Sequence, residues 1–71
     1  MTMLHVGKDK AYDIMKYDEN YVDDMWYCYD THNCIVEYDN MFIAYKYDPE
    51  ASNDEPREFY TFEQALVFLH S

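Results

Sequence analysis

The amino-acid sequence predicts an α+β fold, in which a small antiparallel β-meander of three or more strands is covered on one face by a C-terminal helix over residues 61–70. Two observations predict it. Runs of β-branched and aromatic residues alternate with turn residues between positions 25 and 47, and residues 61–70 carry apolar side chains at helical spacing. The 71 residues allow one domain, 1–71, and a hydrophobic fraction of 49% is too high for a disordered acidic tail.

A β-hairpin is predicted around Asp39 and Asn40, which separate the runs CIVEY and MFIAYKY. Asp and Asn tolerate the positive φ angles that a two-residue hairpin turn requires. With these two residues in the turn, the expected cross-strand pairs are Tyr38 with Met41, Glu37 with Phe42, Val36 with Ile43, Ile35 with Ala44, and Cys34 with Tyr45.

A further strand is predicted in MWYCYD, followed by a turn at residues 31–33. The expected neighbours on the next strand are Cys34 for Cys28, Val36 for Trp26 and Ile35 for Tyr27. One face of the sheet then forms the predicted core, from Trp26, Cys28, Cys34, Val36, Met41, Ile43 and Tyr45. The other face collects Met25, Tyr27, Tyr29, Glu37, Phe42 and Lys46.

The C-terminal helix has a start signal and an apolar stripe. Thr61 is placed to cap the helix, with Gln64 three residues on as in a capping box. The stripe, which is predicted to cover the core face, consists of Phe62, Ala65, Leu66 and Leu69. Val67 and Phe68 lie off this stripe.

The N-terminal third is less regular. Residues 3–6 (MLHV) suit an edge strand, and residues 9–17 (DKAYDIMKY) suit a short helix that uses Ala11, Ile14 and Met15. Residues 17–24 (YDENYVDD) form an acid-rich run, for which a loop or an exposed strand start is expected. Residues 48–58 contain both prolines and a cluster of acids, which predicts an acidic loop.

The net charge of −10, from fifteen acids and five Lys or Arg, restricts the possible partners. Nucleic acid, anionic membranes and acidic substrates are disfavoured, because binding to a polyanion depends on Lys and Arg. A basic protein partner is favoured. No apolar run approaches the roughly 20 residues of a membrane span, and the N-terminus lacks the apolar core of a signal peptide, so a cytoplasmic protein is expected.

Tyrosine is followed directly by aspartate at five places in the chain: Tyr12-Asp13, Tyr17-Asp18, Tyr29-Asp30, Tyr38-Asp39 and Tyr47-Asp48. Acids at strand ends and turns can form rows of carboxylates on the scale of nucleic-acid phosphates, since alternate strand residues are about 6.8 Å apart. Exposed tyrosines add contact area at small entropic cost. Part of the nine tyrosines is expected to fill the core instead.

In charge, size and aromatic content, with YDENYVDD and the Tyr-Asp pairs, the chain resembles small acidic proteins of phages and mobile elements. These are anti-CRISPR proteins, anti-restriction proteins and uracil-DNA glycosylase inhibitors. The resemblance implies a DNA mimic, encoded by a phage and acting in the host cytoplasm, whose target is the basic channel of a nuclease, a CRISPR effector or a glycosylase. The predicted phosphate surrogates are Asp23, Asp24, Asp30, Glu37, Asp39 and Asp48, and the predicted apolar anchors are Tyr27, Tyr29 and Phe42.

The two cysteines are expected to be free thiols that act as small buried residues, although a cross-strand disulfide would also fit their positions. Cys28, His32 and Cys34 form a weak candidate zinc site, because zinc binds thiolate and imidazole. No cofactor is predicted. Neither a glycine-rich phosphate loop nor a distinct catalytic pair is present, so an enzyme is not expected.

Two alternative functions remain open from the sequence. The chain could be a small acidic adaptor or dimerisation module that uses Val67, Phe68 or the exposed sheet face and has no nucleic-acid competitor. It could also be a zinc-stabilised module. A homodimer is compatible with either the mimic or the adaptor.

Overall fold

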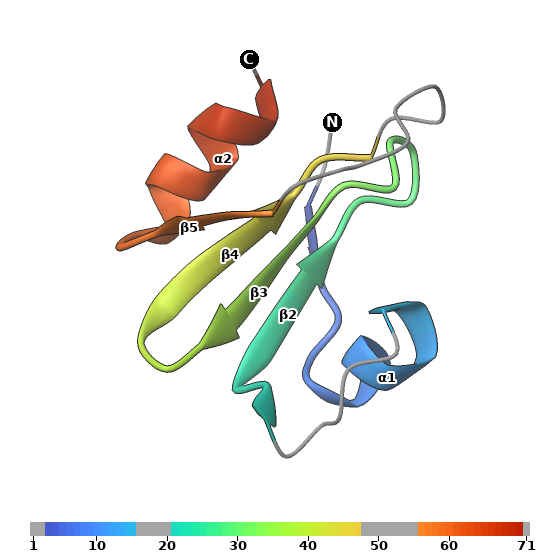
Figure 1. Ribbon diagram of the computed structural model, residues 1–71. Coiled ribbons are helices and arrows are strands. Elements are labelled where there is room, and N and C mark those ends of the chain that lie inside the picture. Colours follow the sequence, from blue (N-terminus) through green and yellow to red (C-terminus); the bar gives the residue numbers. More distant parts are fainter. Residues whose placement is uncertain (1–2, 16–20, 48–55, 71) are drawn as a thin grey trace.

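The computed structural model describes residues 3–15, 21–47 and 56–70. In chain order these residues form β1 (Leu4–His5), α1 (Asp9–Met15), β2 (Asp24–Tyr27), β3 (Cys34–Tyr38), β4 (Met41–Tyr45), β5 (Arg57–Phe59) and α2 (Phe62–His70) (Figure 1). The predicted α+β fold is confirmed, with an antiparallel meander, a C-terminal helix and a short N-terminal helix.

The strands form one five-stranded sheet in the order β1-β2-β3-β4-β5, and each neighbouring pair is antiparallel. The expected acidic loop extends too far, because Arg57 and Glu58 belong to β5, where Arg57 pairs with Ala44 and Glu58 with Ile43. Residues 48–55 of that loop lie outside the described residues. β5 thereby becomes one edge of the sheet, and β1 becomes the other.

The predicted hairpin between β3 and β4 is confirmed. Asp39 and Asn40 both have positive φ angles, of 51° and 62°, as a two-residue turn of this type requires. All five expected cross-strand pairs are present, from Cys34 with Tyr45 to Tyr38 with Met41. Because the turn residues fix the loop length, they also fix the register.

The predicted register between β2 and β3 is wrong by one residue. Met25, and not Trp26, lies opposite Val36, and Tyr27, and not Cys28, lies opposite Cys34. The connection is longer than expected, because the Cys28 N–H donates to the Asn33 carbonyl oxygen at 2.9 Å and leaves four residues in the loop. Since side chains alternate between the two faces, this single residue exchanges the faces of the whole strand.

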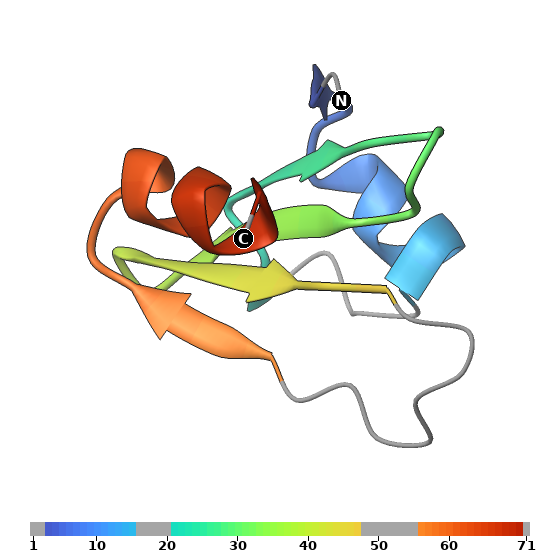
Figure 2. The ribbon, with the colours of Figure 1, turned by 90° about the horizontal axis from the view of Figure 1, so that it is seen from above.

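The sheet consequently carries a core cluster on each face. One cluster is formed by Ala11, Val22, Met25, Tyr27, Cys34 and Val36, with Ile14 and Tyr45 packed against it. The other is formed by Ile35, Ala44, Ala65 and Leu69, with Trp26, Phe42, Phe59, Phe62, Leu66 and Phe68 packed against it. The C-terminal helix therefore covers the face of Ile35 and Ala44, which was expected to lie on the outside. Figures 1 and 2 show α1 and α2 on opposite sides of the sheet.

The start of α2 is capped as predicted, with one change of detail. The Thr61 hydroxyl accepts a hydrogen bond from the Gln64 N–H at 3.1 Å. The Gln64 side-chain oxygen accepts from the Tyr60 N–H at 3.2 Å, one residue before the N–H that a capping box uses. Ala65 and Leu69 are buried, so the predicted stripe is confirmed. Phe68 lies off that stripe yet packs on Phe59, with 5.6 Å between the ring centroids.

The N-terminal segment contains the expected edge strand, β1, and the expected short helix, α1. Gly7 between them has a φ angle of 81°, a conformation that glycine adopts without steric cost. Ala11 is buried and Ile14 packs against the same cluster, which attaches α1 to the sheet beside β2. In residues 3–15, 21–47 and 56–70, there is no helix with the length and hydropathy needed to cross a membrane.

Candidate partner-binding surface

Four of the predicted phosphate surrogates lie at one end of the sheet, where β2 begins and β3 ends. These are Asp23, Asp24, Glu37 and Asp39, and we call them the acidic pole. Asp23 is tied to the end of β3, because its N–H donates to the Glu37 carbonyl oxygen at 2.8 Å. Asp39 lies in the hairpin turn two residues after Glu37 and is exposed.

Two carboxylates of the acidic pole lie directly opposite each other. Asp24 and Glu37 are paired on the antiparallel strands β2 and β3, so their side chains share one face of the sheet. Like charges in such a pair destabilise a sheet, by roughly 0.2–1 kcal/mol. His5 Nε2 lies 2.7 Å and 2.8 Å from the two carboxylate oxygens of Asp24. When the imidazole is protonated, this contact offsets part of the repulsion.

Exposed tyrosines flank the acidic pole. Tyr21 is 66% exposed and precedes Asp23 by two residues, and Tyr38 is 44% exposed and separates Glu37 from Asp39. Neither tyrosine was predicted as an anchor from the sequence. Their position in the sequence was a usable signal, because both lie inside the acidic segments YDENYVDD and EYD.

The three predicted anchors have different positions. Tyr27 is only 9% exposed and belongs to the α1-side core, so its ring cannot serve as a surface anchor. Phe42 is half-buried and packs against Trp26 and Phe62 under α2, with ring centroids 6.1 Å apart in both contacts. Tyr29 is 56% exposed, but it lies in the β2–β3 loop at the opposite end of the sheet.

Asp30, a further predicted surrogate, lies beside Tyr29 in the β2–β3 loop and is therefore separated from the acidic pole by the length of β2 and β3. Asp48 lies outside the described residues. The structure thus brings together four of the nine predicted partner-binding residues. Their common location follows from the antiparallel meander, in which the start of β2 and the end of β3 lie at the same end of the sheet.

A small aromatic cluster occupies the end of the sheet that carries Tyr29. The Tyr27 hydroxyl and His32 Nδ1 are 2.7 Å apart and form a hydrogen bond. Tyr29 contacts the ring of Tyr27 edge-on, with centroids 4.8 Å apart, and Tyr47 contacts His32 at 5.3 Å. Burial, with the nearby Cys34 thiol as the next contribution, raises the pKa of Tyr27 above its ordinary value. The cluster holds the long β2–β3 loop against Tyr47, in the segment that follows β4.

The candidate zinc site is not formed. Cys28, His32 and Cys34 all lie in the described part of the chain, and no group of three potential metal ligands is found there. Strand alternation gives the reason, because Cys34 lies opposite Tyr27 and not opposite Cys28. His32 Nδ1 is already bonded to Tyr27. Both cysteines are buried free thiols, as expected, and burial raises the pKa of Cys34 to about 12.

Two basic side chains of the described residues lie away from the acidic pole. In the part of the chain that the structure describes, Lys46 and Arg57 both lie on the ring of Phe68, 5.9 Å and 5.7 Å from its centroid. Lys46 follows β4 and Arg57 begins β5, so both lie toward the end of the sheet opposite the β3–β4 hairpin. We call these two residues the basic pair.

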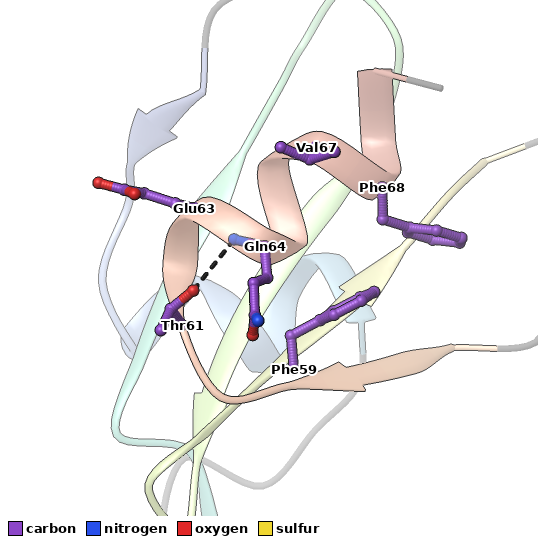
Figure 3. Close-up of a pocket in the computed structure, with 6 residues that line it drawn as sticks. All are labelled: Phe59, Thr61, Glu63, Gln64, Val67 and Phe68. Carbon is purple, nitrogen blue, oxygen red and sulfur yellow. Dashed lines mark hydrogen bonds between the residues drawn. The ribbon is translucent and has the colours of Figure 1, made fainter.

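A groove of about 510 Å³ runs between α2 and β5 and is lined by Phe59, Thr61, Glu63, Gln64, Val67 and Phe68. Figure 3 shows Phe59 on β5 and Phe68 on α2 with their rings side by side, and Val67 on the outer side of the helix. Val67 is 69% exposed. This α2–β5 groove is open, and its apolar lining comes from Phe59, Val67 and Phe68.

Comparison of the chain with protein-family models, with curated proteins and with solved structures finds no significant match. The functional argument therefore depends on the arrangement of the chain's own residues.

Proposed function

We propose that the chain is an acidic protein inhibitor, which binds the basic nucleic-acid-binding surface of a host enzyme or a CRISPR effector by mimicry of DNA. In this proposal it is a phage-encoded anti-defence protein that acts in the host cytoplasm. The acidic pole replaces the phosphates, and Tyr21 and Tyr38 provide the apolar contact beside them. The net charge of −10 supports association with a cationic site through electrostatic steering.

The observation that carries the proposal is the pair of Asp24 and Glu37, directly opposite each other on adjacent strands. A sheet gains stability from opposite charges at such a position and loses stability from like charges. A lysine at position 37 would form the favourable pair. The presence of a second acid there is a local cost that a basic partner would explain, because the partner would neutralise both carboxylates.

The central experiment measures stability and binding together in the Glu37→Lys variant. Stability is expected to stay the same or to rise by up to about 1 kcal/mol, because the introduced ammonium group would face the Asp24 carboxylate. Binding is expected to weaken at least tenfold, which corresponds to about 1.4 kcal/mol. The binding partners to test are a CRISPR effector, a restriction nuclease and a uracil-DNA glycosylase, each in competition with duplex DNA and over a series of salt concentrations.

A matched control is Asp30→Lys, which makes the same change in net charge at an exposed position in the β2–β3 loop. It is expected to weaken binding much less, because that loop is separated from the acidic pole by the length of β2 and β3. Equal losses in the two variants would mean that only the overall charge matters. If none of the targets is bound in competition with DNA, or if affinity is the same at low and high salt, the mimic proposal is rejected.

The adaptor or dimerisation module is a second candidate, favoured by the exposed Val67 beside the α2–β5 groove. An adaptor would bind its partner without competition from DNA. Its affinity would also be unaffected by Glu37→Lys. The competition experiment therefore separates the two functions with the same set of proteins.

A further inference from the structure

The outer face of α2 combines a projecting apolar side chain with an adjacent apolar groove. Val67 is 69% exposed on the helix, and beside it the α2–β5 groove has the rings of Phe59 and Phe68 at its floor. A surface that carries both a projection and an adjacent apolar recess can pair with a second copy of itself. In a two-fold symmetric contact, each copy can insert its projection into the recess of the other.

We propose that two copies of the chain associate through this face, with their α2 helices antiparallel. The arrangement of charge along α2 favours a second copy of the chain as the partner at this face. Glu63 lies in the first turn of the helix, and the basic pair lies on Phe68 near its end. When two such helices run antiparallel, the acidic start of one lies beside the basic end of the other.

The charge arrangement also defines which residues of the two α2 helices face each other. If Gln64 of one copy faces Val67 of the other, the symmetry of an antiparallel pair places Glu63 opposite Phe68 of the second copy. The Lys46 and Arg57 side chains lie over that same Phe68 ring. The apolar contact and the two symmetric charge contacts are therefore satisfied by one helix pairing. A parallel pairing would instead bring Glu63 next to Glu63 and the basic pairs together.

The antiparallel pairing also separates the acidic poles. α2 begins over Trp26 and Phe42, where its first residue Phe62 contacts both rings, and this is the half of the sheet that carries Asp24 and Glu37. Reversal of one copy moves its acidic pole to the far end of the dimer. The two strongly negative regions then lie apart, and both remain open to a basic target.

The contact is small. It consists of one nine-residue helix, the β5 edge and the basic pair, which places it at the low end of interface size, below about 1,200 Å² in total. Association through such an interface is typically weak and transient. The experiment must therefore cover a wide range of concentration, about two decades, with sedimentation equilibrium or light scattering as the measurement.

The first test uses Val67→Asp, which places a charge at the centre of the contact and leaves the folded core intact, because Val67 is mostly exposed. The dimer dissociation constant is expected to rise at least tenfold. Tyr12→Asp, at an exposed position on α1 on the other side of the sheet, is the control and should leave the constant within about twofold. A protein that stays monomeric throughout, or a dimer that Val67→Asp does not weaken, overturns the proposal.

The second test examines the antiparallel register by exchanging charges. Arg57→Glu and Glu63→Arg should each weaken the dimer severalfold, because each leaves like charges in contact. The double variant should recover most of the loss, since the two charges are then exchanged and opposite again. If the double variant is as weak as the worse single variant, the register is wrong. Neither variant changes the acidic pole, so a negative result here leaves the inhibitor proposal untouched.

Discussion

The two faces of the sheet are built differently, although a single sheet supplies both. The α2 face is covered by a nine-residue helix, and the aromatic residues Trp26, Phe42 and Phe62 packed beneath it carry no ionisable group. The α1 face is covered by a seven-residue helix, and its core includes the Tyr27 phenol and the Cys34 thiol. Stability should therefore depend more on α2, and sensitivity to alkaline pH should arise from the α1-side core.

The difference in stability between the two faces can be tested most directly by placing a charge on the sheet-facing side of each helix. Leu69→Asp, at a side chain 4% exposed under α2, should destabilise the fold by about 4 kcal/mol or more, which unfolds so small a domain. Ile14→Asp on α1 should leave the chain folded, since Ile14 is only partly buried. Circular dichroism and thermal unfolding check both. If the two variants lose equal stability, the helices contribute equally and the comparison is wrong.

A cavity made in the core beneath α1 should lower the free energy of unfolding less than the charge introduced beneath α2 by Leu69→Asp. Met25 is fully buried in the α1-side cluster, so Met25→Ala should destabilise the fold by about 2–5 kcal/mol. Met25→Leu, which largely conserves volume, serves as the control and should cost less than about 1.5 kcal/mol. Urea denaturation measures both changes. A loss below about 1 kcal/mol for the alanine variant would show that the α1 face is loosely packed.

The α1 face should also make stability fall at alkaline pH. Burial raises the pKa of Cys34 from about 9 to about 12, so between these values the unfolded thiol ionises while the folded thiol stays protonated. The unfolded state then binds fewer protons, and the free energy of unfolding falls by about 1.4 kcal/mol per pH unit above pH 9. Tyr27, with its raised pKa, adds a loss of the same sign at higher pH.

Urea denaturation at pH values of about 8, 9 and 10 measures this dependence. Cys34→Ala removes the thiol and should flatten the slope above pH 9, even though it lowers stability at every pH. An unchanged slope in that variant would assign the alkaline loss to another group.

The smallest expected effect concerns the start of α2. Thr61→Ala removes the hydroxyl that accepts the Gln64 N–H, and loss of such a cap costs about 1 kcal/mol. Thr61→Ser keeps the acceptor and should be nearly neutral. Thermal unfolding distinguishes the pair. Equal stability of the alanine and serine variants would show that the Gln64 bond to Tyr60 alone holds the end of the helix.

Sequence reasoning could predict part of the candidate site. The acids Asp23, Asp24, Glu37 and Asp39 were selected because they lie in acidic segments of the sequence. The structure brings them together because the start of β2 and the end of β3 lie at the same end of an antiparallel sheet. Tyr27 was selected as an anchor because the expected register placed it on an outer face. The actual register and the covering α1 helix make it a core residue. Which tyrosines are exposed depends on both helices, so it could not be read from a single strand.

The sequence by itself determined the features that depend on neighbouring residues. Asp39 and Asn40 fix the hairpin turn through their own backbone conformations, and Thr61 with the stripe that follows it fixes the position of α2. The tertiary structure alone decided the β2–β3 register and the face that α2 covers. The physical reason is that side chains along a strand alternate between the two faces of the sheet, so one extra loop residue reverses every side chain of β2. Two tertiary contacts hold that loop: the hydrogen bond between Tyr27 and His32, and the bond that the Asn33 side chain accepts from the Tyr47 N–H.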